Sequence, residues 1–515
     1  MKKQLYCILS VIGLLVILFL RISETEQDTF LGFYIEHESM NVKIEIYESD
    51  IGHYDVFLPS YIELTDLMVK VGRKTEIELG GIRLFNKMSC NSFELETEYS
   101  LVINQSYMGE LQFYQSDNVA TMYIDTNSGN MDYIHENQEN VEHTSIALYT
   151  ENGIEDFKTS AAAMKGRGNF TWKWDKKSYV LSLIQPENLL SMGSSNKWIL
   201  LSNAVDESNI RNKLVYDIAS NIEFAGPTQC TYVDLYLNGE YNGLYLLVKK
   251  IDSVPDELGI DLRQGDFLCK IDMNDRWEKL ENPFESSMGR TVEISLPAVV
   301  TENEQARIKV LVDEMENILV SNKDFNSEEI IDVDSWVSRY LIDEIFGNID
   351  SDLASSYFYY SDGRYYAGPL WDYDMTLGNY YRNEDPCSFI AKNPNKSSRD
   401  FSFYNGALYE NDSFYERTVE LYKESFLPVL TKMIDEDVYS LTESISAASK
   451  MNSIRWEDMY KNFYENGIVT PTTIDDMVSY LDSRVGFLNS AWIEGIHYCT
   501  VQFEFTPGVI YHSIS

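Results

Sequence analysis

Short runs in which apolar and charged residues largely alternate dominate the chain from residue 30 to residue 117. Examples are residues 42–47 (VKIEIY) and 93–98 (FELETE). This two-residue period is typical of half-buried strands, and glycines such as Gly52 and Gly72 supply turns between them. The pattern predicts a small β-sandwich-like accessory domain over residues 30–117, with a spacer or partner-binding role and no chemistry of its own.

Helical and strand-like periods mix from residue 118 onward. Residues 197–202 (KWILLS) have the pattern of a buried strand, and the helical pattern that follows Asp206 keeps its apolar residues on one side. The runs 230–237 and 243–248 flank Asn238-Gly239, which is a strong hairpin turn signal. This change of pattern places a domain boundary near residue 117.

Longer amphipathic patterns follow toward the C-terminus. They cover residues 414–433, 436–451 and 473–492, where apolar and charged residues recur at helical spacing. We interpret them as a helical cap. Together with the preceding strands they predict one α+β domain over residues 118–497, and the tail 498–515 has the pattern of a loose strand.

Polar residues follow an apolar helical stripe near the middle of the chain. Residues 333–345 (VDSWVSRYLIDEI) carry their apolar side chains at helical spacing. A half-buried helix here would place Asn348 and Asp350 at its C-terminal exit.

A hairpin and a second acidic segment come next. Residues 356–360 and 364–367 have the pattern of two strands joined across Asp362-Gly363, and Asp372 and Asp374 lie just beyond the second strand. Protein kinases use the same order of a base-bearing loop, a hairpin and a metal-binding aspartate. The alternative is that these acids are solvated loop caps.

Basic residues accompany glycines upstream of these acids. In residues 164–172 (MKGRGNFTW), glycines at two-residue spacing would let the backbone approach a phosphate, and Arg167 would add positive charge. Lys176 and Lys177 begin the next strand, and Arg211 lies on the first predicted helix. A β-turn with solvent-facing lysines is the alternative interpretation.

Composition indicates a globular protein of two or three domains. The 515 residues are 44% hydrophobic and 13% aromatic, which is ample for packed cores. The formal charge of -41 argues against nonspecific nucleic-acid binding, because phosphate contacts need clustered Lys and Arg. The six cysteines form no CxxC zinc motif and no dense disulfide framework.

The first 22 residues have the pattern of a signal anchor or a signal peptide. Lys2 and Lys3 precede an uncharged, largely apolar run from Leu5 to Leu20, and no small-residue cleavage site follows it. The lysines would stay in the cytoplasm, which places the remainder outside. We expect membrane contact through residues 5–20 and an extracytoplasmic protein, either anchored or secreted to the cell surface.

Six separated motifs together resemble the spore-coat CotH kinase family over about residues 131–490. They stand in the family's order and approximate spacing: KGRGN-x-TW at 165–172, KKSY at 176–179, WILLSN with DES and IRNKL at 198–214, YLNGEYNGLYLL at 236–247, SW…E…N-x-D at 335–350 and GPLWDYD at 368–374. The resemblance implies an atypical protein-kinase-like fold that binds ATP with Mg²⁺ or Mn²⁺. It also implies phosphorylation of Ser or Thr in a coat or surface protein.

The resemblance implies roles for individual acidic and amide residues. Asp350 matches the catalytic acid of the family's N-x-D loop, and Asp372 matches the metal-binding aspartate of its W-D-x-D motif. Asn348 and Asp374 are motif neighbours that we also expect at the metal. The predicted fold class is therefore α+β: a kinase-like domain with a helical C-terminal part, preceded by a small β-sandwich-like domain and an N-terminal membrane segment.

The nucleotide side combines matches with departures. Arg167 and Lys177 match the family's basic positions, which would face the phosphates, and Lys176 and Arg211 complete the expected cofactor-binding set. The chain departs from the family's usual residues at four positions on this side, Phe170, Val180, Ser182 and Lys249. A catalytically degenerate surface scaffold or adhesin is therefore the alternative to an active kinase.

Overall fold

The computed structural model describes residues 31–495 apart from residues 32, 38–41, 73–74, 321–329, 381–382 and 393–402. The chain divides into two compact units. The first contains the described residues up to Ser191 together with Tyr232–Tyr245 and Ile445–Glu457. The second contains Met192–Thr231, Leu246–Ser444 and the described residues from Asp458 onward.

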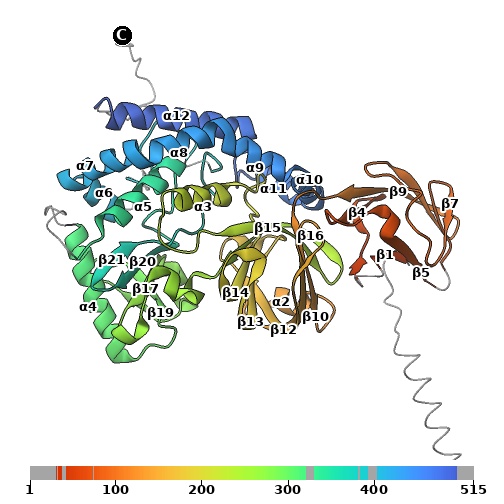
Figure 1. Cartoon of the computed structure of the whole chain (residues 1–515), viewed down its shortest axis with the longest axis horizontal. Helices are drawn as coiled ribbons and strands as arrows, with labels where there is room; N and C mark the ends of the chain where they lie inside the picture. The colour runs from red at the N-terminus through yellow and green to blue at the C-terminus, as the bar shows by residue number, and fades with distance from the viewer. Residues whose placement is uncertain are drawn as a thin grey trace, which may run out of the picture. The chain divides into compact units, whose positions relative to one another are not determined.

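Two β-sheets make up the N-terminal part of the first unit (Figure 1). The three-stranded sheet has the order β2-β1-β5, and the six-stranded sheet has the order β3-β4-β9-β8-β6-β7. Alternate residues of β1 are buried, as expected for a strand with one face on a core. The strands are β1 Phe33–His37, β2 Val42–Ile44, β3 Tyr47–Asp50, β4 His53–Leu58, β5 Leu67–Val71, β6 Ile77–Leu79, β7 Ile82–Leu84, β8 Tyr99–Ile103 and β9 Ser106–Gln115.

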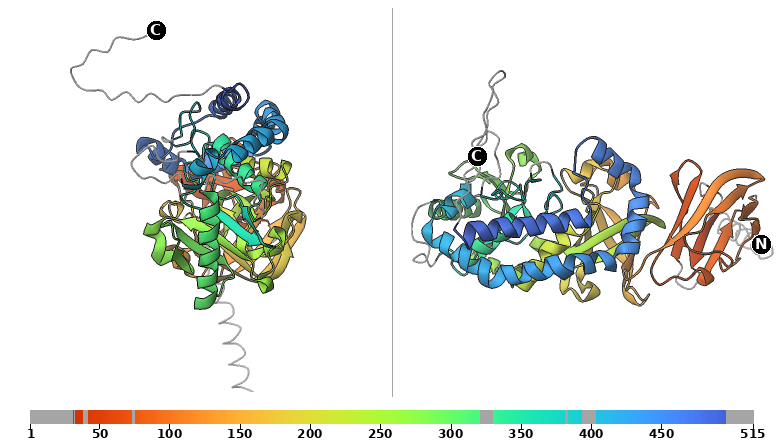
Figure 2. Two further views of the ribbon diagram at one scale, coloured as in Figure 1. Left: turned by 90° about the vertical axis from the view of Figure 1, so that its left-hand side faces the viewer. Right: turned by 90° about the horizontal axis from the view of Figure 1, so that it is seen from above.

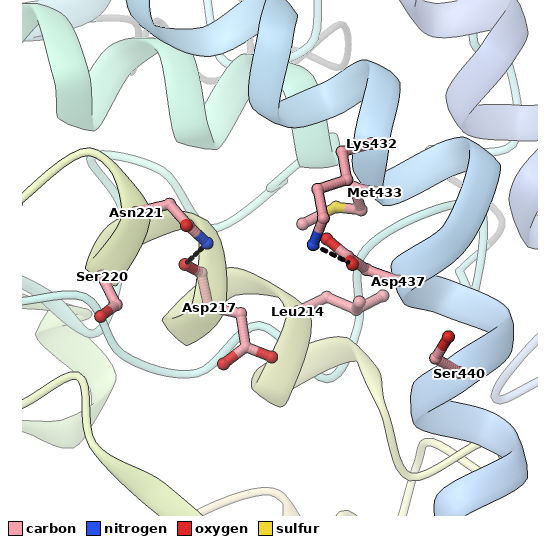
Figure 3. Close-up of a pocket in the computed structure, with 8 residues that line it drawn as sticks. All are labelled: Leu214, Asp217, Ser220, Asn221, Lys432, Met433, Asp437 and Ser440. Carbon is pink, nitrogen blue, oxygen red and sulfur yellow. Dashed lines mark hydrogen bonds and ion pairs between the residues drawn. The ribbon is translucent and has the colours of Figure 1, made fainter.

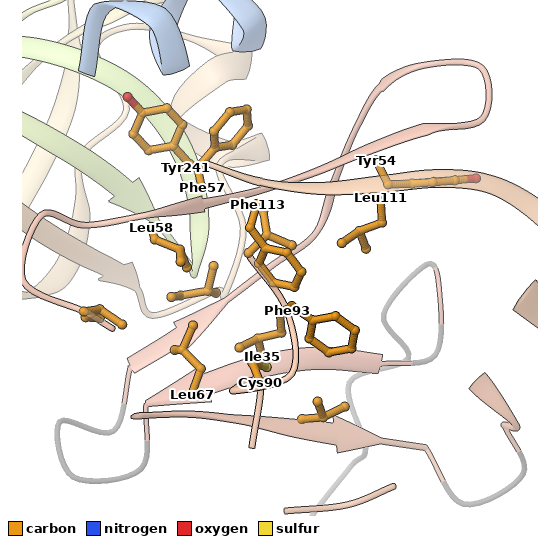
Figure 4. Packing of buried hydrophobic residues seen from close by; sticks show 14 of the residues in the cluster. Ile35, Tyr54, Phe57, Leu58, Leu67, Cys90, Phe93, Leu111, Phe113 and Tyr241 are labelled. Atoms are coloured by element: carbon orange, nitrogen blue, oxygen red, sulfur yellow. The ribbon is translucent and has the colours of Figure 1, made fainter. Parts of the chain in front are cut away.

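A hydrophobic core fills this part of the first unit (Figure 4). Phe93 stacks on Phe113 with the ring centroids 5.7 Å apart. The core continues to Tyr241, whose ring centroid lies 4.8 Å from that of Phe57. Residues on both sides of position 117 therefore contribute to one core.

Seven further strands form a closed barrel in the order β10-β11-β12-β13-β14-β16-β15. The barrel closes because β10 pairs with β15 in parallel, with Ala120 opposite Val233 and Ile124 opposite Leu237. Closure leaves this sheet without an exposed edge. The elements are β10 Ala120–Thr126, α2 Asp132–Glu136, β11 Glu142–Tyr149, β12 Glu155–Arg167, β13 Ser178–Asn188, β14 Ser194–Leu201, β15 Cys230–Leu237 and β16 Glu240–Lys249.

A five-stranded sheet lies in the second unit, with the order β18-β19-β17-β20-β21. Its last two strands form the predicted hairpin, and Asp362 and Gly363 in the turn have φ angles of 48° and 79°. The strands are β17 Phe267–Asp272, β18 Pro283–Glu285, β19 Thr291–Leu296, β20 Ser356–Ser361 and β21 Arg364–Ala367, and the helices nearest in sequence are α3 Arg211–Asn221, α4 Glu302–Leu319 and α5 Val333–Phe346.

The C-terminal part is helical. Single π-helical turns at Tyr422–Phe426 and Met433–Asp437 join α7, α8 and α9 into one long run. In the second unit α12 contacts α5 and α9 and lies alongside this run (Figure 2). The helices are α6 Phe403–Tyr409, α7 Asp412–Leu421, α8 Leu427–Lys432, α9 Val438–Ser444, α10 Ser446–Arg455, α11 Glu457–Glu465 and α12 Ile474–Trp492.

The predicted fold class is wrong and has to be corrected. The chain is a mixed α+β protein with a helical C-terminal part, but it also contains a closed seven-stranded barrel that was not predicted, and the predicted membrane segment is not supported. Local patterns locate individual strands, but closure depends on the pairing of residue 120 with residue 233, which no local pattern encodes.

The expected N-terminal membrane segment has no support in the structure. Within the described residues, no helix is long and apolar enough to cross a membrane. The run from Leu5 to Leu20, which motivated the expectation, lies outside the described residues.

Candidate active site

The loop after α5 is tied to the helix that precedes it. The helix ends at Phe346, and Gly347 has a φ of 68°, a left-handed conformation that closes helices. The Asn348 side chain donates from Nδ2 to Asp343 Oδ1 at 2.9 Å, and its Oδ1 accepts from the Asp350 backbone N–H at 3.0 Å. Buried Asn348 therefore links the helix to Asp350, which is half-buried.

The second acidic segment alternates exposed and buried side chains. Asp372 is exposed and has a φ of 71°, which is unusual for a residue other than glycine. Its Oδ2 accepts from Ser355 Oγ at 3.0 Å. Asp374 is buried, and Asn379 Nδ2 donates to its carbonyl at 2.8 Å. Hydrogen bonds from Ser355 and Asn379 therefore hold this segment at Asp372 and Asp374.

The carboxyl group of Asp374 lies among other carboxylates. Burial raises the pKa of Asp374 well above its ordinary value, and the negative charges of Asp372, Asp206 and Asp350 raise it further. We call these four residues, all in the second unit, the acidic cluster. The structure thus brings together three acids that the sequence singles out and adds Asp206, for which the sequence indicates only the start of a helix.

Asp206 is fully buried and is bound by Arg211. The Arg211 backbone N–H donates to Asp206 Oδ2 at 3.0 Å, and the guanidinium forms an ion pair with the same carboxylate. The guanidinium also donates to the Thr376 carbonyl at 2.9 Å and to Thr472 Oγ1 at 2.6 Å. Arg211 therefore offsets the charge of Asp206 inside the protein, and its contact with ATP stays a prediction.

The donor atoms of the acidic cluster suit a hard divalent cation. Carboxylate oxygens are the ligands that Mg²⁺ and Mn²⁺ prefer, and a cation would offset the repulsion between Asp372 and Asp374. In the part of the chain that the structure describes, no three Asp, Glu, His or Cys side chains are arranged as a formed metal site. Metal binding by Asp372, Asp374 and Asn348 stays a prediction.

The two predicted phosphate-binding lysines lie in the first unit and are bound to backbone carbonyls. Lys176 is buried and donates from Nζ to the Leu244 carbonyl at 2.8 Å. Lys177 Nζ donates to the carbonyls of Trp172 and Trp174 at 3.0 and 2.8 Å, and burial lowers the pKa of Lys177. Both lysines therefore fix the local backbone, and their contact with phosphates stays a prediction.

Arg167 and three of the four family departures lie on barrel strands. Arg167 ends β12, and Val180 and Ser182 lie on the neighbouring strand β13. Lys249 ends β16 in the second unit, where it is buried and forms an ion pair with Glu257. The positive charge of Lys249 is thus balanced within the protein.

An open cavity of about 310 Å³ lies between α3 and the segment around Asp437 (Figure 3). Its charged groups are paired, because Lys432 Nζ binds Asp437 Oδ1 at 2.7 Å and Lys213 binds Asp217. No member of the acidic cluster lines this cavity, so we do not assign it to the candidate site. The lining residues are Leu214, Asp217, Ser220, Asn221, Lys432, Met433, Asp437 and Ser440.

Comparison with known protein families gives a match that covers the candidate site. A family model described as CotH kinase protein matches residues 164–488. This span is more than half of the chain and contains the acidic cluster and every predicted phosphate-binding residue. A search of curated proteins found no match.

Proposed function

This chain belongs to the CotH kinase protein family, and from that premise we propose that it is a protein kinase that transfers the γ-phosphoryl group of ATP to Ser or Thr of another protein. The observation that carries the proposal is the acidic cluster within the matched residues, in which the negative charges of three other carboxylates act on buried Asp374. Four acids gathered in this way fit a chemistry in which a cation must be held beside phosphates.

Asp372 and Asp374 would hold Mg²⁺ or Mn²⁺, with Asn348 close by. The bound ion would neutralise negative charge on the transferring phosphoryl group. Exposure makes the carboxylate of Asp372 accessible to a ligand, and the hydrogen bond from Ser355 Oγ orients that carboxylate. Asp374 is buried, so its ionised form gains more from a nearby cation than an exposed carboxylate would.

Asp350 would orient the acceptor hydroxyl and accept its proton. A general base has to be both reachable and positioned. The side chain of Asp350 is half-buried, and its backbone N–H is fixed by the Asn348 side chain. These two properties support the assignment of Asp350 as the base.

Arg167, Lys176, Lys177 and Arg211 would supply positive charge to the nucleotide. An ammonium group has three donors, and two carbonyls take two of those of Lys177. The third donor of Lys177, whose ammonium also lies 4.8 Å from the centroid of the Trp172 ring, is the one that would bind a phosphate oxygen.

The substrate that we propose is a coat or surface protein. This follows from the association of the CotH family with spore coats and is a proposal about partner class.

A catalytically degenerate surface scaffold is the second candidate function. Two observations favour it: Lys249, where the family usually has Glu, is paired with Glu257, and the ammonium group of Lys176 is buried against a carbonyl. Neither group is then placed to bind ATP. A measurement of nucleotide binding therefore distinguishes an active kinase from a degenerate scaffold.

Calorimetric titration of the full chain with ATP and Mg²⁺ or Mn²⁺ distinguishes the kinase from the scaffold. A kinase should bind metal-ATP with a dissociation constant of about 1 μM to 1 mM, the usual range of substrate constants. Titration in the presence of EDTA is the control and should abolish most of the affinity. No binding at millimolar ATP with either metal would favour the scaffold.

A further inference from the structure

One buried carboxylate connects the two acidic motifs. Asp343 lies on α5 and is 1% exposed, and its carboxylate accepts four hydrogen bonds. Its Oδ1 accepts from Asn348 Nδ2 at 2.9 Å and from the Tyr373 hydroxyl at 2.6 Å. Its Oδ2 accepts from Arg339 Nε at 2.7 Å and from Ser351 Oγ at 2.6 Å. An ionised carboxylate, which only accepts, can take all four of these bonds.

Three of the four donors lie in the two segments that carry the proposed base and the proposed metal ligands. Phosphotransfer requires that these two segments keep a fixed position relative to each other. Asn348 and Ser351 stand on either side of Asp350, and Tyr373 stands between Asp372 and Asp374. One carboxylate therefore binds the loop that carries the proposed base and the segment that carries the proposed metal ligands. All of these residues belong to the second unit.

The remaining donor balances the charge of Asp343. The Arg339 guanidinium forms an ion pair with this carboxylate and also donates to Ser356 Oγ at 3.3 Å. A buried carboxylate without such a partner would be costly. The ion pair lets Asp343 stay buried while its other bonds hold the two motifs.

Tyr373 is fixed at its backbone as well as at its hydroxyl. Its backbone N–H donates to Asn212 Oδ1 at 2.8 Å, and Asn212 Nδ2 donates to Asn203 Oδ1 at 3.0 Å. The backbone bond joins the segment to α3, whereas the hydroxyl joins it to α5. Loss of the hydroxyl alone would therefore release the link to α5 and keep the link to α3.

We propose that Asp343 is a positioning residue of the phosphotransfer site. Through Asn348, Ser351 and the Tyr373 hydroxyl, it holds Asp350 in register with the metal-binding acids. The inference rests on the proposed function, because it adds a residue to that same site. Transfer needs aligned reacting atoms, and a misplacement of about 1 Å costs roughly 100-fold in rate.

Tyr373→Phe tests this proposal because it removes one hydroxyl and leaves the buried ring. Tyr365→Phe is the matched control. Tyr365 is also fully buried in the second unit, and its hydroxyl donates to the Leu311 carbonyl at 2.9 Å, in a bond that belongs to neither acidic motif. The two variants should lose similar thermal stability, so any further difference reports on positioning.

For Tyr373→Phe we expect turnover to fall about 10- to 100-fold, measured with γ-labelled ATP, Mn²⁺ and dephosphorylated casein. We also expect Mn²⁺ affinity, measured by calorimetry without nucleotide, to fall about 10-fold. Amide hydrogen exchange in residues 348–354 should become faster, although these residues are remote in sequence from the substitution. Tyr365→Phe should keep wild-type values in all three measurements.

Ser351→Ala removes a donor on the other side of Asp343. If Ser351 and Tyr373 act through the same carboxylate, their effects are coupled. The double variant Tyr373→Phe/Ser351→Ala should then lose less turnover than the product of the two single losses. Fully multiplicative losses would argue that the two side chains act independently and would overturn the role of Asp343.

Equal behaviour of Tyr373→Phe and Tyr365→Phe in turnover, Mn²⁺ affinity and hydrogen exchange would also overturn the inference. A wild-type protein that binds no ATP would instead refute the kinase proposal. In that case hydrogen exchange still tests whether Asp343 couples the Tyr373 segment to residues 348–354. Faster exchange in Tyr373→Phe than in Tyr365→Phe would support this coupling, and equal exchange would contradict it.

Discussion

The two acids of the proposed catalytic pair are held differently by their surroundings. Asp372 is exposed on a left-handed backbone, whereas Asp350 is half-buried in a loop bound to the end of α5. A metal ligand must carry charge, while a general base must above all be positioned. Their replacements should therefore have different consequences.

Asp372→Asn should weaken metal-dependent ATP binding and abolish transfer, because a neutral amide cannot balance a divalent cation. Asn tolerates the left-handed conformation, so the variant should fold normally. Calorimetry with Mn²⁺ and ATP measures the effect. Asp362→Asn, at an exposed hairpin position with a φ of 48°, is the matched control. Unchanged affinity in Asp372→Asn would remove it from the metal site.

Asp350→Asn should leave metal-ATP affinity nearly unchanged and lower turnover by about 100-fold or more, the usual scale for loss of a general base. The comparison needs kcat, the KM for ATP and a melting curve of the variant. Wild-type kcat would show that Asp350 only caps its loop, and unfolding would show that its role is structural.

Asp234 on β15 makes the stability of the first unit depend on pH. The residue is fully buried, and its Oδ1 accepts from the Tyr241 hydroxyl at 3.0 Å. Burial raises the pKa of Asp234 to about 7, although the Tyr241 bond and the charge of Lys176 lower it in part. From about pH 4 to pH 7 the folded chain thus keeps a proton that the unfolded chain releases, and the free energy of unfolding falls as pH rises.

Asp234→Asn should remove most of that pH dependence, because the amide stays neutral and its Oδ1 can still accept from Tyr241. In the wild-type protein, ionisation of Asp234 above pH 7 should lower the free energy of unfolding by roughly 2 to 4 kcal/mol relative to acidic solution. Melting temperatures at about pH 5 and about pH 8 test this. The wild-type melting temperature should decrease between the two values more than that of the variant, and parallel decreases would contradict the assignment.

Asp206 shows which properties of a single residue the sequence predicts and which it does not. Acidic residues before a helical pattern indicate a helix start, and Asp206 does accept from the backbone N–H of Arg211. Its proximity to Asp374 depends on how distant segments pack, which the sequence does not show. Similarly, the sequence places Asp343 on a helix but does not show its bond to Tyr373.

Among the structural elements, two with strong local signals were predicted correctly, whereas residues 93–98, which have the alternating pattern of a strand, form no strand. The helix expected over residues 333–345 is α5, and the hairpin expected across Asp362-Gly363 is formed by β20 and β21. Helical spacing and turn residues are properties of neighbouring positions. Closure of the barrel was not predictable, because it depends on a parallel pairing between strands far apart in the chain.

Gly347→Ala should disturb the end of α5 and the loop that carries Asp350. Gly347 has a φ of 68°, and an added Cβ would lie 2.8 Å from Tyr480 Oη and 3.1 Å from Ile390 Cδ1. We expect a stability loss of about 1 to 3 kcal/mol and a further loss of turnover. Melting temperature and kcat measure the two effects.

Gly467→Ala is the matched control for this prediction. Gly467 has a similar φ of 61°, but an added Cβ would meet nothing within 4 Å. It should therefore show only the backbone cost, with unchanged turnover. Equal losses in both variants would mean that packing around Gly347 does not position the loop.

For the whole molecule, the family match and the structure address different questions. The match over residues 164–488 establishes the family, while the structure shows that the N-terminal core reaches Tyr236, Tyr241 and Met451. The domain boundaries expected near residues 117 and 497 stay predictions. A change in strand pattern marks the first of them in the sequence, but such a pattern does not reveal which side chains share a core.

Transfer of labelled phosphate by the full chain tests the kinase proposal most directly. The reaction contains γ-labelled ATP, Mn²⁺ and dephosphorylated casein, and the product is analysed for phosphoserine and phosphothreonine. We expect label on these residues with the wild-type protein, and none with EDTA or with Asp372→Asn. Equal labelling by the wild-type protein and by Asp372→Asn would contradict the proposal.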